Sequence, residues 1–185
     1  MNEDKIIQAY TNKNYKLEEN IPNIFAVRNT KVHTDIYPHD YFGVLYKEKE
    51  EWKTIITSGY TQIIPFLKKN AISNLGIVSL IPGQYLEIYR IGYHKLPFEL
   101  LRQVRDMTYL IETSIDSRVI TENKYSNIHR VNTHQLGANL IRYNNGGQFI
   151  INSIDYNKID EIIKKAAYKD NEILFNYTLF KDVNL

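Results

Sequence analysis

Short apolar runs separated by turn-forming or charged residues recur along this chain and predict β-strands. The run 24–27 reads Ile-Phe-Ala-Val, and the runs 42–46 and 52–57 lie on either side of the charged segment 47–51. Two runs rich in β-branched and aromatic residues that flank a short polar segment are typical of a β-hairpin. We therefore expect a hairpin that turns at residues 47–51.

Turn-forming pairs at two later places predict further hairpins. Pro82 and Gly83 lie between the apolar runs of segment 77–93, and proline followed by glycine suits the centre of a type II turn. In segment 140–151 an Asn-Gly pair separates two more apolar runs. This pair favours the type I′ turn of a hairpin, because both central residues of that turn need a positive φ.

A three-and-four spacing of apolar residues predicts the helices. The clearest example covers residues 97–115, where charged residues fall on the opposite side of the helix. Its expected buried stripe consists of Leu101, Val104, Thr108, Ile111 and Ile115. The same spacing predicts a helix over 155–166, and shorter helices are expected over 3–10 and 65–74. A strand over residues 173–180 then ends the pattern.

These elements define the expected fold class. Three hairpins and two substantial helices predict an α+β fold, in which a mainly antiparallel sheet built from hairpins is covered by two to three helices. The length of 185 residues is that of one domain, and no linker-like segment divides the chain. We therefore expect a single compact α+β domain over residues 1–185.

Composition narrows the class of protein further. The chain contains no cysteine, which excludes disulfides, thiolate zinc sites and cysteine nucleophiles. No apolar stretch reaches the roughly 18 residues of a membrane span, and the acidic start is unlike a signal peptide. We expect a soluble, cytoplasmic protein with no membrane partner. Abundant Lys, Asn, Ile and Tyr are typical of an AT-rich genome, such as that of a mobile element or virus.

Arginine and histidine concentrate in one part of the chain. Six of the seven arginines and three of the five histidines lie between residues 90 and 142, whereas lysine is the common base elsewhere. The planar guanidinium group suits bidentate binding of phosphate or carboxylate. The candidate ligand-binding residues are Arg90, Arg118, Arg130 and Arg142. We expect the functional surface in this segment, while the net charge of +2 adds only a weak attraction for nucleic acid.

The surroundings of Arg90 have two interpretations. Strand alternation would place Arg90 on the same face as Leu86 and Ile88, so that the arginine would lie among apolar side chains in a paired, oriented state. The alternative is an arginine that reaches solvent or bridges to an internal carboxylate, as most arginines do. The sequence leaves both interpretations open.

The histidines offer a catalytic alternative. His94, His129 and His134 are candidate acid–base groups, since imidazole exchanges protons near neutral pH. A small metal-independent nuclease or phosphodiesterase would use His129 and His134 as base and acid, with a nearby arginine stabilising charge on the phosphate. The competing interpretation is that these histidines lie in loops or at strand edges and have no catalytic role.

We expect neither a metal nor a cofactor. Asp40 with Glu51 and Lys53 has the residue types of metal-dependent nucleases, but Glu51 falls in a predicted hairpin turn instead of a core strand. The glycine pair in segment 144–147 leads into a strand, whereas phosphate-binding loops lead into a helix. No dinucleotide or Walker fingerprint occurs in the sequence.

The function expected from these observations is binding without catalysis. A Tyr/Arg/His-bearing surface within residues 90–142 would bind a protein partner or an anionic ligand such as a nucleotide or nucleic acid. Immunity proteins, anti-defence proteins and small subunits of larger complexes share this size and composition. Fold alone does not determine an activity, so the small nuclease is kept as the alternative class.

Overall fold

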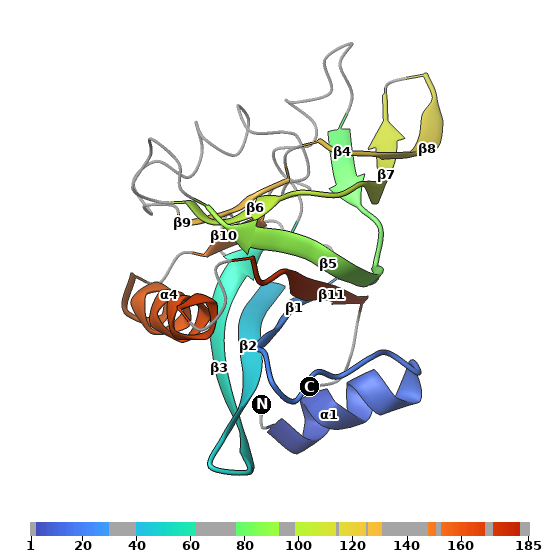
Figure 1. Cartoon of the computed structure of the whole chain (residues 1–185). Helices are drawn as coiled ribbons and strands as arrows, with labels where there is room; N and C mark the ends of the chain where they lie inside the picture. Colours follow the sequence, from blue (N-terminus) through green and yellow to red (C-terminus); the bar gives the residue numbers. More distant parts are fainter. Residues whose placement is uncertain are drawn as a thin grey trace.

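The main body of the protein is a closed β-barrel, seen in a computed structural model (Figure 1). The structure describes residues 3–29, 40–61, 77–92, 99–113, 115–124, 126–130, 148–150, 153–168 and 172–181. The barrel strands are β1 (Asn23–Arg28), β2 (Asp40–Glu48), β3 (Glu51–Tyr60), β5 (Gly83–Ile91), β6 (Glu99–Gln103), β9 (Ile128–Arg130), β10 (Gln148–Ile150) and β11 (Phe175–Lys181). Around the barrel they follow the order β1-β11-β5-β6-β9-β10-β3-β2.

A small sheet and helices complete the described part of the chain. The sheet has the order β4-β7-β8 and consists of β4 (Ile77–Leu80), β7 (Met107–Glu112) and β8 (Ser117–Glu122). The helices are α1 (Glu3–Asn12) and α4 (Ser153–Ala167). No helix among the described residues is long and apolar enough to cross a membrane.

The strand pairing is mainly antiparallel, in agreement with the predicted α+β class. Only β1 with β11 and β9 with β10 pair in parallel within the described barrel. The remaining described pairs are antiparallel. Antiparallel strands with alternating inward and outward side chains produce an apolar interior and leave the outer face for helices, loops or solvent.

β1 is buried on both of its faces, which explains its uninterrupted apolar sequence. Ile24 and Ala26 belong to the barrel core, while the alternate residue Phe25 packs in a second cluster with α1. From α1, Ile6 and Tyr10 are both at most 1% exposed. A strand covered on both faces needs apolar residues at every position, since neither face meets water. The expected helix over 3–10 is therefore confirmed as α1, which covers the outside of the barrel.

Gly43 on β2 allows the aromatic ring of Phe25 to approach the backbone of the sheet closely. Gly43 and Phe25 are directly opposed residues of the β1–β2 pair. A Cβ atom at Gly43 would lie only 2.5 Å from Cζ of Phe25 and 2.6 Å from the carbonyl oxygen of Ile55. Both distances are shorter than van der Waals contact, so the close approach of ring and backbone requires a residue without a side chain.

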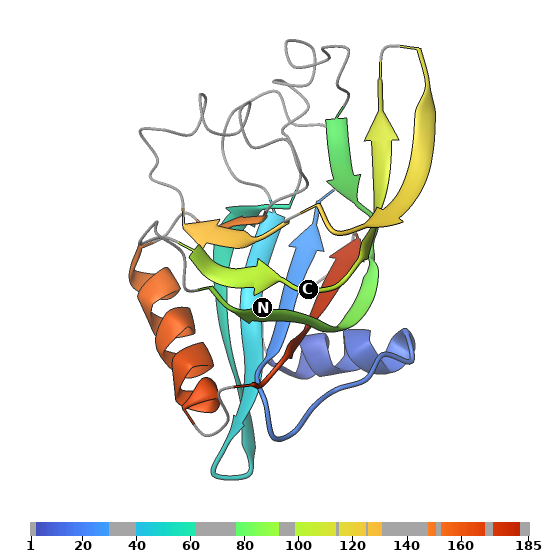
Figure 2. The same ribbon diagram turned by 45° about the horizontal axis from the view of Figure 1, so that its top comes forward.

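α4 covers another side of the barrel with the face that the sequence predicts (Figure 2). Ile159 and Ile163 are fully buried in the core cluster, and Ile162 and Ala166 pack against it. Lys164 and Lys165 lie on the solvent side. The helix begins at Ser153, so Asp155 lies in its first turn, where its negative charge interacts favourably with the helix dipole.

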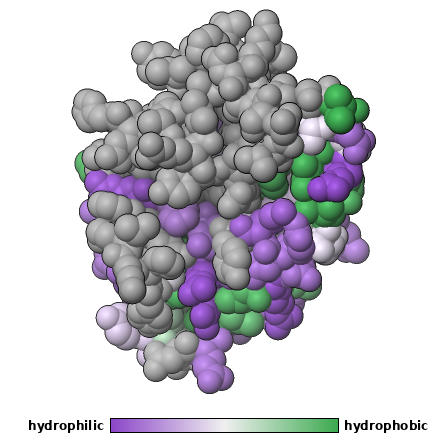
Figure 3. Space-filling model, turned by 90° about the horizontal axis from the view of Figure 1, so that it is seen from above, coloured by the Kyte–Doolittle hydropathy of each residue, from purple (hydrophilic) through white to green (hydrophobic). Residues whose placement is uncertain are grey.

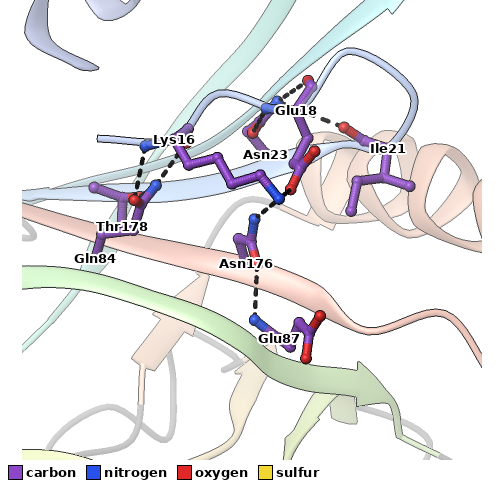
Figure 4. Close-up of polar contacts among 8 residues, drawn as sticks. All are labelled: Lys16, Glu18, Ile21, Asn23, Gln84, Glu87, Asn176 and Thr178. Atoms are coloured by element: carbon purple, nitrogen blue, oxygen red, sulfur yellow. Dashed lines mark hydrogen bonds and ion pairs between the residues drawn. The ribbon is translucent and has the colours of Figure 1, made fainter. Parts of the chain in front are cut away.

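Side-chain hydrogen bonds hold the segment between α1 and β1 against the barrel (Figure 4). The buried Asn23 side chain accepts from the Glu18 N–H at 2.8 Å and donates to the Glu18 carbonyl at 2.7 Å. Gln84 on β5 similarly accepts from the Lys16 N–H at 2.8 Å and donates to its carbonyl at 2.6 Å. Asn176 on β11 donates to the Glu18 carboxylate at 3.2 Å. These amides replace the missing strand partners of an irregular segment.

The predicted helix over residues 97–115 is wrong. The described part of this segment forms β6 and β7, separated by a turn at residues 104–106. β7 alternates strictly between buried and half-buried side chains, which is the period of a strand. The buried Gln103 side chain fixes the turn, since it donates to the Arg105 carbonyl at 2.7 Å and accepts from Tyr109 Oη at 3.0 Å.

The barrel is not assembled from the three predicted local hairpins. β2 and β3 do pair around Lys49 and Glu50, at the place where the first hairpin is expected. The second is wrong, because β4 pairs with β7 whereas β5 pairs with β11 and β6. For the third, β10 pairs with β3 and β9, and residues 140–147 lie outside the described residues. The helix expected over 65–74 also lies outside them.

Candidate anion-binding surface

A bulge in β5 determines which side chains of that strand face outward. Glu87 has a φ of 50°, and the pairing with β11 shifts register at this point. The Glu87 N–H donates to Asn176 Oδ1 at 2.7 Å in place of a regular ladder bond. Beyond the bulge, Ile88 and Tyr89 are both buried, so the simple alternation of side chains is broken.

Arg90 reaches solvent as a result of this bulge. The expected face on which it would lie among apolar residues is not formed, since Ile88 is 2% exposed while Leu86 is 48% exposed. Arg90 itself is exposed. The structure therefore agrees with the second interpretation drawn from the sequence, in which Arg90 reaches solvent.

Arg90 lies directly opposite a second arginine on the outer side of the barrel. Arg90 of β5 and Arg102 of β6 are cross-strand partners, while their neighbours Tyr89 and Leu101 are fully buried. Directly opposed residues share a face of the sheet, with Cβ atoms about 5 Å apart. None of the described carboxylates lies within ion-pair distance of either guanidinium group. The two positive charges are therefore adjacent and not neutralised within the described part of the chain.

The nearby Arg105 provides a contrast. Its guanidinium group lies 2.6 Å from the carboxylate of Glu87, and both side chains are more than half exposed. An exposed pair of this kind contributes little stability, about 0–1 kcal/mol. It does, however, neutralise Arg105 and leaves Arg90 and Arg102 as the positively charged pair on this surface. Arg102 and Arg105 were not among the ligand-binding residues predicted from the sequence.

The other predicted residues lie on different elements. Arg118 is exposed on β8, in the small sheet. Arg130 on β9 is half-buried, and its guanidinium carbon lies 5.8 Å from the ring centroid of Tyr156 on α4, a cation–π contact. His129 is half-buried on the opposite face of β9 from the buried Ile128, as strand alternation requires.

The remaining candidates lie outside the described residues. These are His94, His134 and Arg142. The acid–base pair of His129 and His134 is thus represented in the described structure by His129 alone. The described residues do not place a second histidine beside it.

A buried arginine outside the predicted segment forms the most complete polar network. Arg28, at the end of β1, is 5% exposed. Its Nε donates to Thr61 Oγ1 at 3.0 Å, Nη2 to the Thr61 carbonyl at 2.7 Å, and Nη1 to the Leu80 carbonyl at 2.7 Å. Asp40 accepts from the Thr61 N–H at 2.8 Å and from its hydroxyl at 2.7 Å. The network joins the ends of β1, β2 and β3 to β4.

The electrostatics of this network come from two opposite charges, Arg28 and Asp40, that are linked through Thr61. Burial lowers the pKa of Arg28 from its usual value, and the nearby Asp40 opposes that shift. Each guanidinium nitrogen donates to an acceptor inside the protein, and the side chain is buried. Its donors are therefore engaged within the fold and are not presented to a ligand.

The arrangement of Asp40 and Glu51 argues against a metal-dependent nuclease site. Asp40 pairs with Gly59 at one end of the β2–β3 hairpin, whereas Glu51 pairs with Glu48 at the other. That separation along β2 corresponds to about 26 Å at the usual rise per strand residue. Among the described residues, no three side chains of metal-ligating type lie together.

A groove between α4 and the β2–β3 hairpin is a concave feature of the described residues, with a volume of about 540 Å³. Its charged residues come in both signs and several are already paired. Lys47 lies 3.0 Å from Glu19, and Glu48 lies 2.6 Å from Lys53, which lowers the pKa of Glu48. With charges of both signs on its lining, and with Lys47 and Glu48 already paired, this groove has less reason to attract an ion than the surface of Arg90 and Arg102.

Comparison with known proteins does not assign this arrangement to a class. No protein-family model matches the sequence. No curated protein and no solved structure is significantly similar to the chain.

Proposed function

We propose that this chain is a non-catalytic binding protein that binds an anionic ligand on the outer surface of β5 and β6. The observation that supports the proposal is the direct opposition of Arg90 and Arg102 without a carboxylate beside them among the described residues. Like charges placed directly opposite each other destabilise a sheet by a fraction of a kcal/mol to about 1 kcal/mol. A bound anion removes that repulsion.

The chemistry of the pair favours phosphate or carboxylate. Each guanidinium group offers parallel N–H donors that match two oxygens of such an anion. Two of them on neighbouring strands act as a clamp whose position is set by the rigid barrel beneath. The main attraction is between opposite charges, so affinity falls as salt concentration rises.

The test is a binding titration with a fluorescent single-stranded oligonucleotide, with tripolyphosphate as competitor. Exchanging both Arg90 and Arg102 for Ala is expected to weaken binding at least about tenfold and to reduce the salt dependence, since up to two phosphate contacts are lost. Lys164 and Lys165 on the outer face of α4 provide the matched control. Their replacement with Ala removes the same charge and is expected to change affinity little.

Two results would contradict the proposal. Equal losses from the arginine pair and the lysine pair would mean that only net charge attracts the probe. An oligonucleotide shortened during the titration, with cleavage abolished by replacing His129 with Ala, would support the nuclease instead. Melting temperatures measured in parallel show whether each variant remains folded.

A further inference from the structure

β8 forms the outer edge of the small sheet. It pairs with β7 along its whole length, and no strand of the described chain pairs with its other side (Figures 1 and 2). Every residue of β8 except the half-buried Ile120 is exposed. Open strand edges invite pairing with another strand, and proteins commonly cover or block them.

The hydrogen bonds of β7 show which backbone groups of β8 point outward. The Thr113 N–H donates to the Asp116 carbonyl at 2.7 Å, so this opposed pair is hydrogen-bonded. Hydrogen-bonded and non-hydrogen-bonded pairs alternate along an antiparallel ladder. With the observed register, the backbone groups of Arg118, Ile120 and Glu122 face β7. Those of Ser117, Val119 and Thr121 consequently face away from it.

The opposite edge of β7 supports the same assignment. The Thr108 carbonyl accepts from the Ile81 N–H at 2.9 Å, on the side of β4. Thr108 is paired with Thr121, and their hydroxyls lie 3.1 Å apart, as in a close non-hydrogen-bonded pair. The N–H and C=O of Thr121 are therefore directed to the open edge.

The charges along β8 are antisymmetric about Ile120. Arg118 and Glu122 lie at equal distances on either side of Ile120, and Asp116 and Lys124 follow at equal distances beyond them. All of them fall on the same face as Ile120 if the strand direction continues, because they differ from it by even steps. Within one copy Glu122 also contacts Lys124, but the two side chains are 48% and 28% exposed, so solvent weakens this pair and it competes only weakly. An antiparallel pairing of β8 with a second β8 about Ile120 would bring every charge opposite its complement.

We propose that two copies of this chain associate by antiparallel pairing of their β8 strands, with the two-fold axis at Ile120. Arg118 then lies opposite Glu122 of the second copy, and Val119 opposite its Thr121. The outward N–H and C=O groups of Val119 and Thr121 bond each other across the axis. A two-fold axis makes each contact occur twice, which doubles the effect of each complementary pair.

Charge also selects this register over its neighbour. A slide of two residues, which moves the axis to Val119, places Asp116 opposite Glu122 and Arg118 opposite Ile120, which costs like-charge repulsion and loses the ion pairs. Apolar contact supports the association: Val119 is 60% exposed and Ile115, at the end of the β7–β8 hairpin, is 93% exposed. In Figure 3, apolar (green) and hydrophilic (purple) residues lie side by side at the right of the view, the side on which Figure 1 draws the small sheet.

The experiment measures the oligomeric state by sedimentation velocity from low to high micromolar protein. The wild-type chain is expected to show a concentration-dependent dimer. Arg118→Glu and Glu122→Arg should each weaken the dimer by about tenfold or more, because both symmetric ion pairs become repulsive. The double exchange should restore it. A mixture of the two single variants should form a heterodimer, since the first variant carries glutamate at both positions and the second carries arginine at both.

A backbone variant tests the pairing independently of charge. Val119→Pro removes an N–H that faces outward, so the β7 pairing survives while the pairing of two copies is blocked. An unchanged melting temperature with loss of the dimer is the expected result. A wild-type monomer at all concentrations, or a double exchange that fails to restore the dimer, would overturn the proposal. Replacing Arg90 with Ala leaves the dimer intact, which separates this result from anion binding.

Discussion

The arginines of this protein show how strongly one residue type depends on its surroundings. Arg28 is buried and has an acceptor for each of its nitrogens, whereas Arg90 is exposed beside a like charge. Burying a guanidinium group is costly unless its donors are bonded and its charge is balanced. Arg28 meets this condition through Thr61 and Asp40, and so it is a structural residue at the end of the barrel.

Removing Arg28 should destabilise the fold more than removing any exposed arginine. Arg28→Ala leaves the carbonyls of Thr61 and Leu80 without their donor and Asp40 without its nearby positive charge. A loss of about 3–5 kcal/mol in the free energy of unfolding is expected. Urea denaturation followed by circular dichroism measures it, with Arg90→Ala as the exposed control, expected within about 0.5 kcal/mol of wild type. A tolerated Arg28→Ala would show that the network is dispensable.

For single residues, the sequence predicts which side chains are suited to binding better than it predicts where they lie in the fold. The concentration of arginine in segment 90–142 led to Arg90, and the structure places Arg90 beside Arg102. The bulge at Glu87 could not be predicted, because glutamate has no preference for a positive φ and no glycine marks the position. Arg28 drew no expectation of burial, since its partners Thr61 and Leu80 are distant in the sequence.

Helices and strands were predicted well in segments where the apolar residues fit only one spacing, and poorly where they fit both the helical and the strand spacing. α1, α4, β1 and β11 agree with their expected segments, because only one pattern fits each. In segment 97–115 the helical stripe shares Leu101 with the buried residues of β6 and Ile111 with the buried residues of β7. No glycine or proline marks the turn at residues 104–106. Pairing with β4, β8 and β5 then decides the outcome in favour of strands, since isolated propensity is weak.

A pair of isoleucines four residues apart distinguishes the strands from the helix. In a helix Ile111 and Ile115 would share one buried face, whereas here Ile111 is 6% exposed and Ile115 is 93% exposed. Ile111→Asn is expected to lower the free energy of unfolding by about 2–5 kcal/mol, since it removes buried apolar volume and buries a polar amide. Ile115→Asn should change it by less than about 0.5 kcal/mol. Thermal melts of both variants distinguish the strands from the predicted helix. Equal losses of stability would support the helix.

The whole molecule depends on contacts between segments that lie far apart in the chain. β1 near the start pairs with β11 near the end, and β6 pairs with β9. Local patterns do not specify which strands become neighbours, so the closed barrel could not be deduced from the sequence. Tyrosines contribute to its core: the rings of Tyr89 and Tyr177 meet edge to face at 5.6 Å, and both residues are fully buried. The sequence allowed tyrosine either of two roles, at a binding surface or at the edge of a sheet core.

These buried tyrosines should make the fold sensitive to alkaline pH. Burial raises the pKa of Tyr85 and of Tyr109 to about 12, and it raises the pKa of Tyr89 and of Tyr177 well above the usual value. Below pH about 10 these phenols are protonated in the folded and the unfolded chain, so their ionisation does not make the free energy of unfolding depend on pH. Above it the unfolded chain releases protons that the folded chain retains, and the free energy of unfolding falls.

The expected slope is up to about 1.4 kcal/mol per pH unit for each such tyrosine, so several together should unfold the protein within a narrow alkaline range. The absorbance of tyrosinate, on the long-wavelength side of the tyrosine band, and the far-ultraviolet circular dichroism should then change over the same pH range. Tyr89→Phe keeps the ring but loses the hydrogen bond to the Ser126 carbonyl. This variant should be less stable at neutral pH and show a shallower alkaline slope. Gradual ionisation of all tyrosines without loss of structure would mean that the barrel core is open to solvent.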